Sequence, residues 1–294
     1  FAGNVRFRLA PEQNNGPGGG GQQLTFLVAD KTTLLDGLQV RHHQRERLVH
    51  AQFAGADFGH SVGIRRVAGE VKSAQTFDRD YLAEKVWQNT MIPAYSFVPP
   101  GISGYETRTT EYAEMSQIDR EDAAKKVLAD LSYGPDKPLK MEIRYNTSEN
   151  HKNTAVAIQE QLKPLGVEVT LLNTDTKTHY GHLEQHGDFD VARAGWIADY
   201  KDPSNFLDLC KTGAGNNYSE YSSKEYDDFL AAGAAAASPE ERMKNLSDAE
   251  AVGVARDLCV LPLLYYGFHT VVSSKLKGWE DNVMDVHPSR FLSK

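Results

Sequence analysis

The sequence predicts an α/β fold with a sheet that is at least partly parallel. Patterns typical of strands and helices alternate between residues 139 and 194 in the order β-α-β-α-β, which is usual where helices connect parallel strands. The chain has 294 residues, of which 40% are hydrophobic, so it can bury a substantial core. We therefore expect one large domain or two ordinary ones.

The first predicted elements are two helices. Residues 78–88 form a helical pattern. Asp78 suits its first position, because a negative charge is favoured at the N-terminal end of a helix. Residues 119–131 place alanine and leucine side chains on one face, and a Gly-Pro pair ends this second helix.

The alternating elements follow. Residues 139–145 alternate as a strand, with its apolar side chains on one face. Gly166 ends the next helix, which is predicted at residues 150–165. The last element of the series is a short strand at residues 190–194. The apolar face consists of Leu139, Met141, Ile143 and Tyr145, and the later elements are a helix at 150–165, a strand at 167–172 and a helix at 177–185.

The stretch DVARAGWIADY contains the best candidate for a binding site. Its strand at residues 190–194 is followed by Gly195, where another backbone could approach closely, and then by Trp196 and Asp199 on a predicted loop. Tryptophan offers a large apolar wall, and a carboxylate accepts charge-assisted hydrogen bonds from an ammonium group. The pattern fits a ligand with a free amine beside a side chain. The alternative is a buried Trp196 and an internal ion pair between Arg193 and Asp199.

The C-terminal third contains two further predicted helices, at residues 223–237 and 239–256. Each begins with a Ser-x-x-Glu capping box, and the second has proline at its first helical position. Residues 258–272 form a long apolar pattern typical of a strand, interrupted by Pro262. The capping pairs are Ser222 with Glu225 and Ser238 with Glu241.

No catalytic motif is visible. The sequence lacks a G-x-S-x-G elbow, a P-loop and a G-x-G-x-x-G motif after a strand. His179, His182 and His186 form the tightest histidine group, and the last two could share a helix face as zinc ligands do. However, H-L-E-Q-H is not H-E-x-x-H, and exposed polar residues are the simpler interpretation. We expect no enzyme, no cofactor and no metal; a metal-dependent hydrolase is a weaker alternative.

Bulk properties limit the function classes further. The net charge of −8 argues against a nucleic-acid partner, and the basic patch RHHQRER at residues 41–47 is expected to be a solvated face. The sequence has no run of about 18 apolar residues, so no membrane span is expected. No signal peptide is visible, so an exported protein would be present in its mature form.

The two cysteines give little information about function by themselves. Cys210 and Cys259 match no metal-binding spacing, and the sequence leaves open whether they form a disulfide. Cys259 lies in an apolar stretch and is expected to be a small buried hydrophobic residue.

Six ordered segments resemble one known family. The stretch DVARAGWIADYKDPSNFL at residues 190–207 is similar to the cleft segment of bacterial extracytoplasmic oligopeptide-binding proteins, the family 5 solute-binding components of peptide ABC importers. With five other segments in the same order, the resemblance covers about residues 77–294. The others are FDRDYLAEKV (77–86), MIPAYSFVPPG (91–101), EDAAKKVLADLSYGPDKPLKMEIRYNTSENHK (121–152), NNYSEYSSKEYDDFL (216–230) and LCVLPLLYY (258–266).

The resemblance implies a periplasmic binding protein-like fold, of type II and cluster C-like, here as a lobe with a mixed sheet flanked by helices. What matches is the C-terminal half of longer family members, and the N-terminal lobe has no visible counterpart. The expected organisation is an irregular Gly-rich segment at residues 1–60, a ligand-binding α/β lobe at 61–262, and a segment at 263–294 that returns toward the other lobe.

The resemblance also implies a function. The protein would bind extended peptides outside the cytoplasm, as in the periplasm, for ABC-type import, with a membrane ABC permease complex as partner, no nucleic acid, and a monomeric state. The main chain around Gly195 and Ile197 would pair with the peptide, Asp199 would hold its α-ammonium group, Trp196 would line a side-chain pocket, and Arg193 and His151 would make polar or carboxylate contacts.

The chain departs from the family at two positions before the cleft strand. Family members can carry a further tryptophan and an arginine where this sequence has Thr176 and Glu184, so pocket specificity is not carried over. A non-transport interaction protein built on a truncated binding-protein fold is the other alternative.

Overall fold

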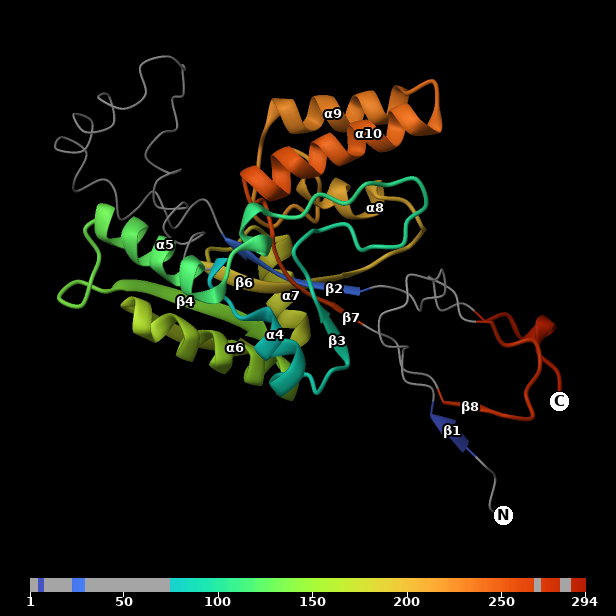
Figure 1. The fold of residues 1–294 in the computed structure, drawn as a ribbon, viewed down its shortest axis with the longest axis horizontal. Helices are drawn as coiled ribbons and strands as arrows, with labels where there is room; N and C mark the ends of the chain where they lie inside the picture. The colour runs from blue at the N-terminus through green and yellow to red at the C-terminus, as the bar shows by residue number, and fades with distance from the viewer. Residues whose placement is uncertain (1–4, 8–22, 30–74, 267–270, 281–286) are drawn as a thin grey trace.

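The computed structural model describes residues 5–7, 23–29, 75–266, 271–280 and 287–294 (Figure 1). Apart from residues 5–7 and 23–29, the predicted Gly-rich segment at residues 1–60 lies outside these residues, and so does the basic patch at residues 41–47. Among the helices of the described residues, none has the length and apolar character needed to cross a membrane.

A six-stranded mixed sheet forms the centre of the molecule, in the order β3-β7-β2-β6-β4-β5 (Figure 1). Two neighbouring pairs are parallel, and the others are antiparallel. This mixed sheet with flanking helices confirms the predicted fold class. The strands are β2 (Gln23–Ala29), β3 (Met91–Pro93), β4 (Leu139–Asn146), β5 (Val167–Thr174), β6 (Val191–Ile197) and β7 (Leu261–Tyr266), while β1 (Val5–Phe7) and β8 (Val271–Ser273) form a separate antiparallel pair.

Two strand predictions need correction. Part of the segment expected to be irregular forms β2, which lies between β6 and β7 inside the sheet. The long strand predicted at residues 258–272 is divided into β7 and β8, which belong to different sheets. β7 shifts register against β2 next to Pro262, because proline has no N–H for the ladder. The predicted domain limits at residues 60 and 262 stay a prediction.

The predicted helices between residues 78 and 256 are present, several with a different final turn. Side chains cap the starts of five of them, as expected where N–H groups lack helical partners. The helices are α4 (Arg79–Tyr81) continuing as η1 (Leu82–Val86), η2 (Glu111–Glu114), α5 (Gln117–Asp130), α6 (Glu149–Leu162) with η3 (Lys163–Leu165), α7 (Thr176–Glu184), α8 (Ser204–Leu207) with η4 (Asp208–Cys210), α9 (Lys224–Ala235), α10 (Pro239–Glu250) with η5 (Ala251–Arg256), and η6 (Ser289–Phe291).

One of the two predicted capping boxes is confirmed. The hydroxyl of Ser238 accepts a hydrogen bond from the Glu241 N–H at 3.1 Å, and proline is the next residue. At α9 the cap is Ser223 rather than Ser222, and its hydroxyl accepts from the Tyr226 N–H at 3.3 Å. The two helices then pack side by side (Figure 1).

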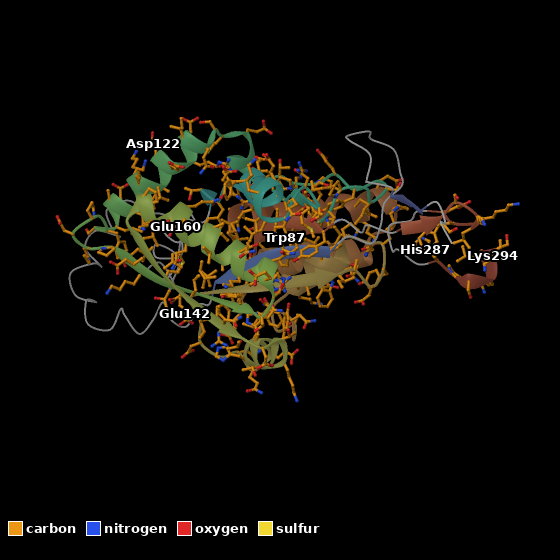
Figure 2. All side chains as sticks on the ribbon, turned by 90° about the horizontal axis from the view of Figure 1, so that it is seen from below. Trp87, Asp122, Glu142, Glu160, His287 and Lys294 are labelled. Atoms are coloured by element: carbon orange, nitrogen blue, oxygen red, sulfur yellow. A yellow bond between two sulfur atoms is a disulfide. The ribbon has the colours of Figure 1, made fainter. Side chains whose placement is uncertain are left out.

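One hydrophobic cluster joins β4 and β7 to α5 and α6. The predicted apolar face of β4 is confirmed, since all four of its side chains are buried in this cluster. Trp87 lies inside the same cluster and donates its indole N–H to the Thr154 hydroxyl at 3.0 Å. Charged side chains such as Asp122 and Glu160 lie at the surface of these helices (Figure 2).

A second cluster lies beneath α8, α9 and α10. Tyr226 is its largest fully buried aromatic residue, and the phenol donates to the Leu207 carbonyl at 2.6 Å. A Cβ on Gly253 would lie 2.4 Å from the Tyr226 ring, so only glycine allows this close packing.

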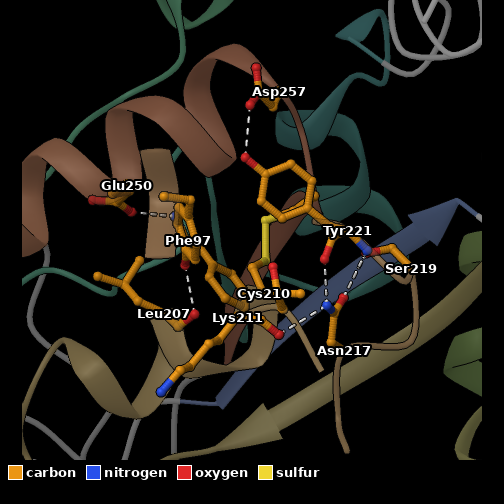
Figure 3. Close-up of a disulfide and its surroundings, with 12 residues drawn as sticks. Phe97, Leu207, Cys210, Lys211, Asn217, Ser219, Tyr221, Glu250 and Asp257 are labelled. Atoms are coloured by element: carbon orange, nitrogen blue, oxygen red, sulfur yellow. Dashed lines mark hydrogen bonds between the residues drawn. A yellow bond between two sulfur atoms is a disulfide. The ribbon is translucent and has the colours of Figure 1, made fainter. Parts of the chain in front are cut away.

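The two cysteines form a disulfide within the second cluster (Figure 3). Cys210 and Cys259 are 1% and 3% exposed, and their Cα atoms are 6.0 Å apart. Cys259 is therefore buried as expected, but as one half of a disulfide. The bond ties the end of η4 to the residues that precede β7.

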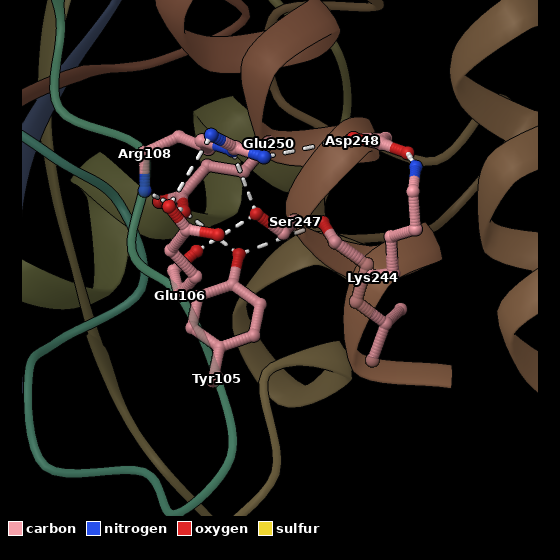
Figure 4. A network of polar contacts seen from close by, with 8 residues as sticks. Tyr105, Glu106, Arg108, Lys244, Ser247, Asp248 and Glu250 are labelled. Atoms are coloured by element: carbon pink, nitrogen blue, oxygen red, sulfur yellow. Dashed lines mark hydrogen bonds and ion pairs between the residues drawn. The ribbon is translucent and has the colours of Figure 1, made fainter. Parts of the chain in front are cut away.

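Glu250, the last residue of α10, is a fully buried carboxylate (Figure 4). One oxygen accepts from the N–H groups of Phe97 and Val98, both at 2.8 Å. The other accepts from the Tyr105 hydroxyl at 2.7 Å and the Arg108 N–H at 3.1 Å. Burial raises the pKa of this carboxyl, and the hydrogen bonds to its charged form oppose the rise. The carboxylate thus anchors the loop at residues 97–108 to α10.

Candidate functional site

The candidate site lies along the second half of β6. Val191 and Ala192 pair with β4, whereas beyond them β6 pairs only with β2 among the described strands. The Arg193 carbonyl accepts a hydrogen bond from His179 Nε2 at 2.7 Å. Successive residues of a strand direct their N–H and C=O groups to opposite sides. Gly195, two residues after Arg193, therefore directs these groups to the same side as the Arg193 carbonyl. On that side, β6 pairs with β4 at Val191 and Ala192, and beyond Ala192 it pairs with no strand of the described residues.

Trp196 lies within β6, not on the loop where the sequence pattern placed it. It is partly buried against the second cluster, so it is neither a core residue nor a free surface residue. Its indole N–H donates to the Asn205 side-chain oxygen at 2.7 Å. The next residue, Ile197, ends the strand and is 55% exposed. The half-buried indole thus forms an apolar wall beside an exposed strand end.

Asp199 is exposed and is the second residue after this strand end. Its N–H donates to the Asn205 side-chain oxygen at 3.3 Å. Within the described residues its carboxylate has neither a hydrogen bond nor an ion pair. The ion pair with Arg193 that the sequence left open as an alternative is therefore not formed, and the carboxylate is available to a ligand.

Arg193 points into a buried polar cluster instead. Its guanidinium donates to the Asn146 side-chain oxygen at 3.2 Å, the Tyr180 hydroxyl at 2.9 Å and the Tyr266 hydroxyl at 3.3 Å. His151, at the start of α6, also contacts Tyr266, because its Nε2 atom lies 3.5 Å from the Tyr266 hydroxyl. The fold therefore brings Arg193 and His151 together through residues that the sequence pattern did not single out, while their contacts with a peptide stay a prediction.

The histidines of this cluster are neutral at pH 7. Burial, followed by the nearby positive charge of Arg193, lowers the pKa of His151 to about 4. Since the Asn146 carbonyl can only accept, the His151 proton lies on Nδ1, 3.2 Å from that oxygen. Burial is also the main cause that lowers the pKa of His179 to about 4. The Nδ1 atom of His179 is buried with no hydrogen-bond partner among the described residues.

We expect His179 to make folding sensitive to acid. Because its pKa is lower in the folded state, the unfolded chain takes up the proton first, and stability is lost as pH falls from about 6.5 toward 4. Charges facing it include Arg193, Arg144 and His182, and all oppose protonation. Between pH 6.5 and 4.5 the wild type should lose up to about 2 kcal/mol more than His179→Gln in urea unfolding. Parallel pH profiles for the two proteins would contradict this expectation.

Several site residues were not recognisable from the sequence. Tyr266 lies in an apolar strand and resembles a core residue, and Asn146 ends β4 without any motif. Asn205 lies in the short helix α8, which is not among the helices predicted from the sequence. Only their contacts with β6 assign them to the site.

The histidine group does not form the metal site kept as an alternative. The helix α7 ends at Glu184, and His186 follows in a left-handed conformation with φ of 52°. His182 bonds the Asp188 carbonyl at 2.8 Å, while His186 lies 3.7 Å from Glu220. The described residues contain no group of three or more histidine, cysteine or acidic side chains arranged to hold a metal.

The fold is a mixed sheet flanked by helices, and the candidate site combines the unpaired second half of β6 with the exposed Asp199 carboxylate. Residues 74–218 match the family described as bacterial extracellular solute-binding proteins, family 5 Middle. This part of the chain belongs to the family, as the sequence segments indicated.

Two relatives illustrate the similarity. The periplasmic oligopeptide-binding protein OppA of Salmonella typhimurium is 38% identical over 190 residues, which cover 64% of this chain and 35% of that protein. The periplasmic murein peptide-binding protein MppA of Escherichia coli is 35% identical over 221 residues, which cover 74% of this chain and 41% of that protein. The chain thus spans well under half the length of these relatives.

Solved structures agree with the fold. The unliganded open form of the murein tripeptide-binding protein MppA aligns with a TM-score of 0.74 and 28% identity, over 94% of this chain and 48% of that one. The Haemophilus influenzae OppA complex with RPPGFSPFR gives a TM-score of 0.71 and 26% identity, over 92% and 48% of the two chains. The relatives are binding proteins by name.

Proposed function

We propose that this chain binds peptides for ABC-type import, as part of an extracytoplasmic solute-binding protein. The observation that carries the proposal is the Asp199 carboxylate, exposed and without a partner in the described residues, beside the half-buried indole of Trp196. An ammonium group with an adjacent side chain matches these two features, and a peptide N-terminus supplies both.

An extended peptide would add to the open side of β6. Main-chain hydrogen bonds from Gly195 and Ile197 would hold it without reading its side chains, which is how strand addition tolerates varied sequences. Arg193 and His151 would make polar contacts beyond the first residues, through the tyrosine that they share. The cognate partner would be a membrane permease complex, and the binding protein would act as a monomer.

The compartment follows from the same proposal. The Cys210–Cys259 disulfide fits a protein that resides in an oxidising environment such as the periplasm, because cytosolic thiols are kept reduced. The two relatives described above are periplasmic by name.

The ligand class needs a direct test, because family relatives differ in it. A relative from Escherichia coli, 33% identical over 156 residues, is named a probable deoxycholate-binding periplasmic protein. A bile acid carries no ammonium group, so it would gain nothing from the Asp199 carboxylate. A titration that compares peptides with deoxycholate therefore separates the two ligand classes.

Asp199→Asn should weaken peptide binding by tenfold or more, because a charge-assisted hydrogen bond contributes about 1.5–3 kcal/mol. Isothermal titration with a mixture of tripeptides to pentapeptides measures the loss. Asp136→Asn is the matched control, since it removes the same charge from another exposed site and should leave the affinity unchanged. Equal affinities for Asp199→Asn and the wild type would remove the assigned role of Asp199, and a wild type that binds no peptide would refute the proposed function.

A further inference from the structure

We infer that Asn205 is the positioning residue of the proposed peptide site, and that its side-chain oxygen sets the selectivity for a free peptide N-terminus. The inference rests on the proposed function. The residue lies within the stretch at 190–207 that resembles the family's cleft segment, but only its contacts assign it this role.

One oxygen atom joins the two features of the site. Asn205 Oδ1 accepts the indole N–H of Trp196 at 2.7 Å and the main-chain N–H of Asp199 at 3.3 Å. The apolar wall and the carboxylate are therefore held in one fixed relation by a single acceptor. Asn205 is 5% exposed, so water cannot readily replace it as the partner of both donors.

The main chain of Asn205 is itself fixed. Its N–H donates to the Asp202 carbonyl at 3.1 Å, while the Asp202 carboxylate accepts from the Ser204 N–H at 2.9 Å. These bonds form the turn that begins α8. The acceptor is thus mounted on a short rigid element rather than on a mobile loop, as precise ligand geometry requires.

The turn is also held from outside the site. Arg242 of α10 donates to the Asp202 carboxylate at 2.8 Å and to the Gly233 carbonyl at 3.1 Å. The α9–α10 pair therefore supports the turn on one side, and Asn205 reaches from the same turn to the two site residues.

Selectivity follows from this geometry. A carboxylate stabilises an ammonium group strongly only when the two charges meet at hydrogen-bond distance, whereas a side chain packs against an indole over a broad area. Loss of the Asn205 acceptor should release the Asp199 main chain and hence misplace its carboxylate. Binding of a free N-terminus would weaken, while binding of an N-acetylated peptide, which lacks the charge, would change little.

The test compares a tripeptide with its N-acetylated form by isothermal titration. The wild type should prefer the free amine by tenfold or more, and Asn205→Ala should reduce this preference to about twofold. Asn205→Asp keeps an acceptor at the same position and should retain the preference. The aspartate variant also provides the test if the alanine variant does not fold.

Asn217→Ala is the matched structural control. Asn217 is 3% exposed and bonds the Lys211 and Tyr221 carbonyls, so it holds another loop without touching Asp199 or Trp196. It should lower stability but keep the preference. A full preference in folded Asn205→Ala, its loss in folded Asn205→Asp, or an equal loss in Asn217→Ala would overturn the inference. Absence of peptide binding in the wild type would instead overturn the proposed function on which it rests.

Discussion

Replacing Cys210 and Cys259 together with alanine should lower the free energy of unfolding by about 4 kcal/mol. The disulfide closes a loop with a sequence separation of 49 residues, and loop-closure entropy of the unfolded chain predicts a cost of this size. Alanine is preferred to serine because both positions are buried in an apolar cluster, where an unpaired hydroxyl would add a separate penalty. Urea unfolding under oxidising conditions measures the loss.

Chemical reduction of the wild type provides the control for this variant. Wild type equilibrated with a strong thiol reductant should unfold at the same urea concentration as the double alanine variant, because both lack the cross-link. The double variant should not respond to the reductant, since the chain has two cysteines in total. An unchanged urea midpoint in the variant would show that the bond does not stabilise the fold.

Glu250→Met should cost about 3–5 kcal/mol of unfolding free energy, the second of the two largest expected effects. Methionine has a similar volume, but it leaves the N–H groups of Phe97, Val98 and Arg108 and the Tyr105 hydroxyl without their acceptor. Each unsatisfied buried donor costs about 1–3 kcal/mol, and partial rearrangement recovers some of the sum.

Glu106→Met is the matched control for Glu250→Met. Glu106 belongs to the same region and lies 3.6 Å from Arg108, but its side chain is 78% exposed (Figure 4). It should therefore change stability by less than about 0.5 kcal/mol. Hydrogen exchange adds a local measurement, because the amides of Phe97 and Val98 should lose protection only in Glu250→Met. Similar losses in both variants would contradict an anchoring role for Glu250.

Much of the fold could be predicted because its signals are local. The alternating pattern of β4, the glycine after α6 and the Ser238 cap each depend on residues within a few positions of one another, and all three are confirmed. The sequence also offered the segment with Trp196 and Asp199 as a candidate site, and that role stays a prediction. The strand boundary in this segment was misplaced, because strand length depends on the neighbouring strand.

The part that could not be predicted consists of contacts between distant residues. Arg193 was open to pairing with Asp199, six residues along the chain, yet it lies against Tyr266, 73 positions away. The zinc-like pair of histidines, which the sequence left as a weaker alternative, is not formed for a related reason. His182 and His186 share a helix face only if the helix continues, and α7 ends between them.

The sequence by itself determined the order of helices and strands, the family, and the residue types available at the end of β6, because periodicity, capping and motifs are written in neighbouring residues. Only the tertiary structure decided that β2 lies between β6 and β7, that the two cysteines pair, that Glu250 meets a loop 152 residues away, and that Asn205 joins Trp196 to Asp199. Such contacts depend on how the whole chain packs, and no local pattern specifies which distant groups will meet.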